Sequence, residues 1–178
     1  MPAAESRATA ARRIARLRVP LGFVFGVAAV ALSHPSASSL LLGGIVGACG
    51  EVVRIWAAGH LEKGREVTRS GPYRWTRHPL YAGSSIMGVG LAIASRSAIV
   101  SVLVLGYLAV TIGAAIRTEE AHLSWKFGGE YDAYRHGTAA PVARRFSAAR
   151  AIRNREYRAA LGFAVVLAIL ALRSRGVL

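Results

Sequence analysis

The chain has 178 residues, of which 53% are hydrophobic and only 18% are charged. Soluble domains carry about a quarter charged residues, so this composition, with a mean hydropathy of +0.38, argues against a water-soluble domain and indicates an integral-membrane protein. The formal net charge is +14. Because the basic residues lie between apolar blocks and no nucleic-acid recognition module is visible, we expect contact with anionic lipid headgroups and no nucleic-acid partner.

The first apolar segment follows five arginines and predicts a membrane span at about 19–32. A cleaved signal peptide is the alternative, but "SHPSASS" at 33–39 is a weak cleavage signal and the apolar pattern resumes directly after it. A second span is predicted at about 40–58. The pairs Gly22/Gly26 and Gly43/Gly47 have the four-residue spacing that lets membrane helices pack closely. The single cysteine, Cys49, excludes an intramolecular disulfide and is expected to be a buried thiol.

Near the end of the second predicted span, Glu51 and Arg54 lie three residues apart on one helical face. Charges at membrane depth are costly and invite a functional explanation. We favour a mutual ion pair, and the alternative is that Arg54 meets a ligand carboxylate.

The segment "RSGPYRWTRHPLYAG" at 69–83 leads into a third predicted span at about 79–95. Pro79 suits the first turn of a helix. This places His78 at the helix N-terminus, where free backbone N–H groups and the helix dipole can hold an anionic group. Tyr81 and Gly83 follow on the first turns, with Gly83 allowing close approach. The alternative is that these residues only mark the membrane interface.

A fourth span is predicted at about 98–116, and the segment "RTEEAHLSWKFGGEYDAYRH" follows it at 117–136. We expect the helix to continue past the membrane and to end at Gly128-Gly129. The aromatic residues could form an interfacial belt. However, anionic headgroups repel Glu119 and Glu120, so these carboxylates are better explained as groups that bind a hydroxylated or cationic ligand.

The last apolar segment, 159–172, is short against the about 20 residues that a spanning helix needs, so its flanking basic side chains would have to reach the headgroups. If all five segments cross, the basic segments 59–77 and 117–158 and the N-terminus share one side, which the positive-inside rule assigns to the cytoplasm. We therefore predict an all-α, integral-membrane helical bundle with about five transmembrane helices, formed by residues 1–178 as one domain in a bacterial inner membrane. No metal site is expected, because no HxxxH or HExxH pair occurs.

Two of these stretches, "SGPYRWTRHPLYAG" at 70–83 and "RTEEAHLSWKFGGEYDAY" at 117–134, resemble the isoprenylcysteine carboxyl methyltransferase family and its bacterial relatives. That family belongs to a wider group of integral-membrane methyltransferases that includes the phospholipid N-methyltransferases. The resemblance covers about residues 50–145. It implies S-adenosylmethionine as the methyl donor, bound in a cytosolic pocket that the segment after the helical hairpin closes.

The resemblance also implies roles for individual residues. Arg117 and Glu120, in an R-x-E-E element, are candidate catalytic residues. The implied cofactor contacts are His78, Tyr81, Gly83, Arg117, Glu119, Glu120, Tyr131 and Tyr134. The chain departs from the family at 140–146, where "APVARRF" replaces a Val-x-x-x-x-Pro ending, and it adds a basic helix and the segment 159–172.

The predicted function is methyl transfer to a lipidic or membrane-embedded acceptor, with O-methylation of an isoprenylcysteine-like carboxyl group favoured. One alternative is phospholipid N-methylation. Another is an NADPH-dependent membrane reductase, but the Arg-His-Pro element of such enzymes usually continues with Asn-Tyr and Gly-Glu, whereas this chain has Leu80-Tyr81 and Gly83-Ser84. A third is a membrane scaffold without catalytic activity. No obligate protein partner is evident.

Overall fold

The structure is a computed structural model that describes residues 26–177. Within this part of the chain every regular element is a helix, so the predicted all-α class is confirmed. Residues 26–31 are helical, and the first half of the predicted first span, 19–32, lies outside the described residues. The remaining elements are α2 (Ala37–Ala58), the 3₁₀-helix η1 (Gly71–Arg74), α3 (Pro79–Ser95), α4 (Ala98–Phe127), α5 (Gly129–Arg135), α6 (Ala148–Arg153) and α7 (Tyr157–Ser174).

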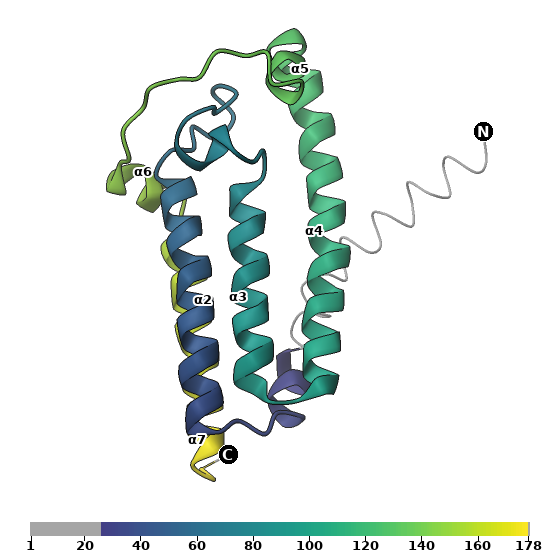
Figure 1. Cartoon of the computed structure of the whole chain (residues 1–178), viewed down its shortest axis with the longest axis vertical. Coiled ribbons are helices and arrows are strands. Elements are labelled where there is room, and N and C mark those ends of the chain that lie inside the picture. The colour runs from purple at the N-terminus through teal and green to yellow at the C-terminus, as the bar shows by residue number, and fades with distance from the viewer. Residues whose placement is uncertain (1–25, 178) are drawn as a thin grey trace, which may run out of the picture.

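The long helices form a bundle in which α2, α3 and α4 stand side by side and α7 lies behind α2 (Figure 1). Residues 59–78 and 117–156 gather at one end, which we call the motif end. Residues 33–36, 96–97 and 175–177 lie at the opposite end. Both basic segments expected to share a side are therefore at the same end of the bundle.

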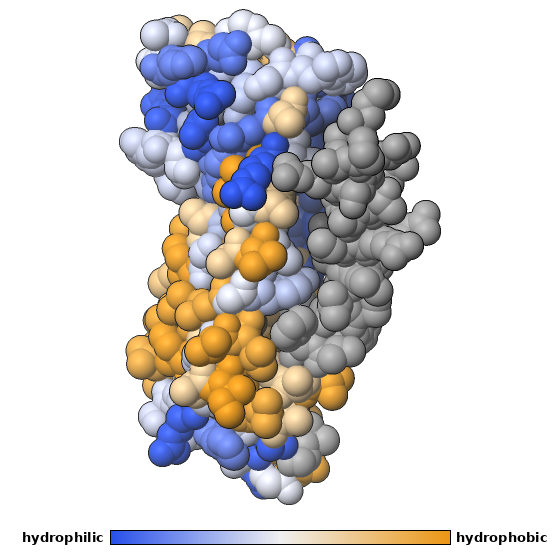
Figure 2. All heavy atoms as spheres, turned by 90° about the vertical axis from the view of Figure 1, so that its right-hand side faces the viewer, coloured by the Kyte–Doolittle hydropathy of each residue, from blue (hydrophilic) through white to orange (hydrophobic). Residues whose placement is uncertain are grey.

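Three of the helices, α2, α4 and α7, are long and apolar enough to cross a membrane, and α3 is a shorter apolar helix of 17 residues. Figure 2 shows apolar residues in a band between the polar motif end and a smaller polar cap. The predicted membrane helical bundle is thus confirmed. The last helix runs over Tyr157–Ser174, 18 residues, which is longer than the predicted 159–172 and corresponds to about 27 Å.

Glycines bring α2 and α3 into direct backbone contact. A Cβ atom on Gly50 would lie 2.6 Å from the carbonyl oxygen of Gly83, and one on Gly90 would lie 2.6 Å from that of Gly43. A Cβ atom on Gly47 would collide with the ring of Phe163 in α7. The predicted packing role of Gly43 and Gly47 is confirmed, since no side chain larger than hydrogen fits between these helices.

Local signals set the ends of α3 and α4. His78 is the N-cap of α3 and Pro79 is its first residue, as the sequence predicts. The side chain of Ser97 caps α4 by accepting a hydrogen bond from the backbone N–H of Val100. The same helix ends at Phe127 because Gly128 adopts a positive φ of 48°, which confirms the predicted stop.

One expectation for α2 needs correction, and another is confirmed but incomplete. Cys49 is exposed rather than buried. Arg54 does lie near Glu51, at 3.9 Å from Nε to Oε2, but its closest ionic partner is Glu156, at 2.6 Å from Nε to Oε1. Arg54 also donates to the carbonyl oxygen of Leu80 in α3. It therefore fastens α2 to α3 and to the residue before α7, a partner 102 residues away that local spacing cannot reveal.

Candidate functional site

A cavity of about 1250 Å³ extends from the motif end, beside the start of α3, along one face of α4. Five of the residues that the resemblance singles out line it: His78, Tyr81, Glu119, Tyr131 and Tyr134. They come from α3 and its cap, from the part of α4 beyond the predicted span, and from α5. The structure therefore brings residues from both sequence motifs to a single cavity.

The two motifs meet directly at Glu120. Its Oε1 lies 3.1 Å from Nε2 of His78 and 3.1 Å from Nη1 of Arg77. A carboxylate only accepts hydrogen bonds, so Nε2 carries the hydrogen that it shares with Glu120. The other ring nitrogen of His78, Nδ1, is buried and has no hydrogen-bond partner among the described residues. Such a group costs free energy unless a ligand or water satisfies it.

Two tyrosines of α5, Tyr131 and Tyr134, also line the cavity. Tyr131 is 1% exposed, its ring lies 6.2 Å from that of Tyr134, and the Tyr134 hydroxyl donates to the carbonyl oxygen of Tyr73 at 2.7 Å. Burial raises the pKa of Tyr134 to about 12, and burial followed by the nearby Glu120 carboxylate raises the pKa of Tyr131. Both hydroxyls are therefore neutral hydrogen-bond donors at physiological pH.

Three of the implied contacts lie elsewhere. Gly83 faces α2, because a Cβ atom at this position would lie 2.5 Å from Cγ of Arg54 and 2.7 Å from the carbonyl oxygen of Gly50. Arg117 is exposed and is not among the residues that line the cavity. Glu120 is turned toward His78 rather than into the cavity. Successive residues of a helix point about 100° apart, which is why Glu119 lines the cavity and Glu120 does not.

One face of α4 forms most of the apolar wall, and we did not predict it from the sequence. Its lining residues recur every three or four positions, as expected for one side of a helix: Val102, Leu103, Gly106, Tyr107, Val110, Thr111, Ala114, Ala115 and Thr118. This stretch covers about 24 Å of helix. The recurrence of small and hydroxyl-bearing residues at this spacing was the sequence signal that could have indicated this face.

The rim of the cavity includes the connection between α2 and η1, which two contacts tie to α4 and α5. Nζ of Lys126 donates to the carbonyl oxygen of Gly64 at 2.7 Å, and Arg69 forms an ion pair of 3.2 Å with Glu130. The cavity is thus polar at the motif end and apolar along α4, so it can hold a polar molecule and an apolar chain next to each other.

Comparison with known proteins gives a family match over the same region. The model of the family described as "Phospholipid methyltransferase" matches residues 53–130, which contain the first sequence motif and the second one up to residue 130. The chain is also 33% identical over 107 residues to the "Nickel-cobalt-cadmium resistance protein NccN" of Alcaligenes xylosoxydans xylosoxydans. That alignment covers 59% of this chain, and the chain spans about half the length of this curated relative. No solved structure matches the chain.

The match supports an enzyme that transfers methyl groups at a membrane. Taken with the two motifs that converge on Glu120, it confirms the sequence-based recognition: residues 53–130 match the phospholipid methyltransferase family of integral-membrane methyltransferases, which is related to the isoprenylcysteine carboxyl methyltransferases.

Proposed function

We propose that this protein transfers a methyl group from S-adenosylmethionine to a lipidic or membrane-embedded acceptor. The observation that carries the proposal is the contact between His78 and Glu120 at the polar end of the cavity, because it unites the two motifs of a methyltransferase family at one site. We further propose that residues 1–178 act as one domain and that the motif end faces the cytoplasm, where its many basic residues satisfy the positive-inside rule.

The residues at the polar end suit S-adenosylmethionine, which supplies an electrophilic methyl group on a sulfonium when bound. The Glu119 carboxylate lines the cavity and can accept from an amino or ribose hydroxyl group. The neutral hydroxyls of Tyr131 and Tyr134 and the unsatisfied Nδ1 of His78 supply further polar groups. We propose His78, Tyr81, Glu119, Tyr131 and Tyr134 as cofactor contacts, with Glu120 as a positioning residue that orients His78.

The apolar face of α4 suits the acceptor. The cavity of about 1250 Å³ exceeds the roughly 300–1,000 Å³ of pockets that hold one drug-sized ligand, so it has room for a second molecule. A chain lying along Val102–Ala115 would reach the polar end from the membrane. The chemistry then depends mainly on holding donor and acceptor in line.

O-methylation of a carboxyl group is the favoured reaction, because a carboxylate needs no general base and its charge is partly cancelled as the methyl group transfers. Phospholipid N-methylation is the second candidate, and the description of the matching family favours it. An amine must first lose a proton, for which Glu119 or His78 would have to act as base.

Binding of labelled S-adenosylmethionine to the purified full chain tests the cofactor. We expect binding by the wild type, a loss of binding in His78→Ala and a weaker loss in Glu120→Ala. The matched control is His136→Ala, because His136 is exposed at the same end of the bundle and lies outside the cavity. Absence of binding by the wild type near cellular cofactor levels would overturn the proposal.

The product distinguishes the two acceptors. Proteoliposomes made with bacterial lipid extract and labelled S-adenosylmethionine should yield labelled lipid. Treatment with alkali releases labelled methanol from a methyl ester, whereas an N-methyl group stays on the lipid headgroup. Volatile label after alkali supports carboxyl methylation, and label retained on the headgroup supports N-methylation.

A further inference from the structure

A second, smaller pocket of about 460 Å³ lies at the motif end beside the end of α2. Its walls include Trp56 and Trp75 together with Arg74, Arg144 and Arg145. None of the described residues that line it belongs to the larger cavity. Nothing in the proposed methyl transfer uses this pocket.

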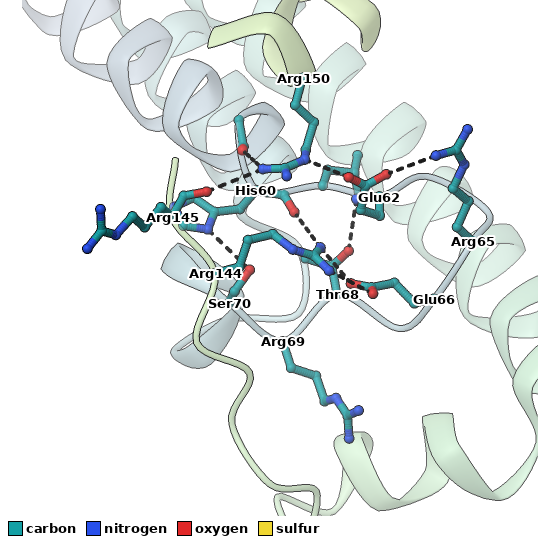
Figure 3. Close-up of polar contacts among 12 residues, drawn as sticks. His60, Glu62, Arg65, Glu66, Thr68, Arg69, Ser70, Arg144, Arg145 and Arg150 are labelled. Atoms are coloured by element: carbon teal, nitrogen blue, oxygen red, sulfur yellow. Dashed lines mark hydrogen bonds and ion pairs between the residues drawn. The ribbon is translucent and has the colours of Figure 1, made fainter. Parts of the chain in front are cut away.

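Only part of the positive charge around the pocket is neutralised within the protein. Arg144 forms an ion pair of 2.6 Å with Glu66 and donates to the carbonyl oxygen of His60. Within residues 26–177, by contrast, the exposed guanidinium groups of Arg74 and Arg145 have no ion pair and no hydrogen bond. Figure 3 shows the Arg145 side chain directed away from the network that holds Arg144 and Arg150.

The imidazole of His60 also lines the pocket, and it carries no negative charge that could neutralise the arginines. Its pKa is lowered, first by burial and then by the neighbouring Arg150, Arg144 and Arg74. No described residue in the lining is acidic. The pocket is therefore a site of uncompensated positive charge, which favours an anionic occupant.

The pocket lies at the level where a lipid headgroup would be. Trp56 is two residues from the end of α2, and its ring lies 5.5 Å from that of Trp75. Tryptophan pairs of this kind are typical of the membrane–water interface. Below Trp56, α2 exposes Val52, Ile45 and Leu41, which are 65%, 54% and 67% exposed. Their spacing places all four residues on one face of the helix.

We propose that this pocket binds the headgroup of an anionic phospholipid from the leaflet at the motif end. The phosphate contacts Arg74 and Arg145, the tryptophan rings cover the glycerol region, and an acyl chain lies along Val52, Ile45 and Leu41. The apolar stripe directly below the arginines is the reason to choose a membrane phospholipid over a soluble phosphate, which would have no use for that stripe.

Native mass spectrometry of the purified full chain in detergent with mixed phosphatidylglycerol and phosphatidylcholine tests the site. We expect preferential retention of phosphatidylglycerol. A basic residue near an anionic bilayer strengthens binding roughly fivefold, so Arg74→Gln and Arg145→Gln should each weaken retention by about that factor, and more so together. Arg74→Lys with Arg145→Lys should retain the lipid.

Arg158→Gln is the matched control, because it removes the same charge from an exposed position at the start of α7, next to the motif end and outside the pocket. It should retain phosphatidylglycerol like the wild type. Both pocket arginines are exposed, so the variants should keep the wild-type elution profile and helical circular dichroism. Equal retention of both lipids, an unchanged double variant, or displacement of the lipid by millimolar glycerol 3-phosphate would each overturn the proposal.

Discussion

Nε2 of His78 lies 3.1 Å from Oε1 of Glu120, although the two residues are 42 positions apart in the chain. His78 ends the connection that leads into α3, and Glu120 lies in the last turns of α4. The α3–α4 hairpin returns the chain to the motif end and so makes this contact possible. Arg77 holds the same carboxylate oxygen at 3.1 Å, which fixes Glu120 in place and through it the imidazole.

Replacement of Glu120 should affect the cofactor by way of His78. Hydrogen bonds to charged groups contribute about 1.5–3 kcal/mol, so we expect Glu120→Ala to weaken S-adenosylmethionine binding by roughly tenfold or more. Glu120→Gln keeps a carbonyl oxygen that can accept from Nε2 and should weaken binding less. Equilibrium binding of labelled cofactor measures both. If Glu120→Gln and Glu120→Ala bind equally poorly, Glu120 contacts the ligand itself rather than positioning His78.

The hydroxyl of Tyr134 should matter for stability. Its hydrogen bond to the carbonyl oxygen of Tyr73 connects α5 to η1. Tyr73 is buried, with 7% of its surface exposed. Tyr134→Phe leaves that carbonyl oxygen without this donor, and we expect a loss of about 1–3 kcal/mol. Thermal unfolding in detergent measures the loss. Tyr157→Phe is the control, since Tyr157 is 53% exposed, and equal melting temperatures for both variants would contradict the expectation.

Residues with a strong local signal could be predicted from the sequence. Pro79 and Gly128 each impose a backbone geometry that starts or ends a helix, so the start of α3 and the end of α4 follow from them. The motif residues could also be recognised in the sequence. The side of a helix that faces the cavity could not be predicted, because the rotation of α4 that separates Glu119 from Glu120 depends on packing against the rest of the bundle.

Gly83 and Arg54 are two further residues whose contacts could not be predicted from the sequence. A glycine next to a motif can approach a ligand or another helix, and the sequence does not say which. Arg54 has an ionic partner three residues away, yet its shortest ionic contact is with Glu156. Tertiary contacts of this kind are decided by the whole bundle rather than by spacing within one segment.

Gly83→Ala should lower the stability of the bundle, and the added methyl group should make no contact with the cofactor. The added Cβ atom would lie 2.7 Å from the carbonyl oxygen of Gly50, so α2 and α3 must move apart, at a cost of about 1–3 kcal/mol. Gly113→Ala is the control, because an added Cβ atom there meets nothing within 4 Å. A variant with unchanged melting temperature but reduced cofactor binding would restore Gly83 as a ligand contact.

The contact between Arg54 and Glu156 should be the most sensitive of the ion pairs in the bundle. The Glu156 residue is 6% exposed, and Glu51, which is 7% exposed, has no hydrogen-bond partner for either side-chain oxygen among the described residues. Arg54→Ala would leave both carboxyl groups without their cation, and removing one member of a buried pair costs about 3–5 kcal/mol.

Unfolding in detergent with increasing sodium dodecyl sulfate measures this loss. Arg158→Ala, which removes an exposed arginine near the same helix end, should change stability by no more than about 0.5 kcal/mol. The double variant Arg54→Leu with Glu156→Leu should lose less than Arg54→Ala alone, because no charge of the pair remains buried. Equal losses in Arg54→Ala and Arg158→Ala would contradict the assigned role.

The attachment of α6 to the end of α2 should depend on pH through Glu62. Nε of Arg150 donates to Oε1 of Glu62 at 2.7 Å (Figure 3), and this hydrogen bond is the main reason that the pKa of Glu62 is lowered. A carboxyl group with a lowered pKa in the folded state stabilises that state above its ordinary pKa, and the stabilisation is lost as the pH falls through the lowered value. We therefore expect the 137–147 connection to become more accessible to an acid-tolerant protease such as pepsin as the pH falls below the ordinary glutamate pKa of about 4.3. Glu62→Gln should be cleaved as readily at pH 4.5 as at pH 3, whereas a wild-type chain with the same flat profile would show that the Arg150 contact does not hold the connection.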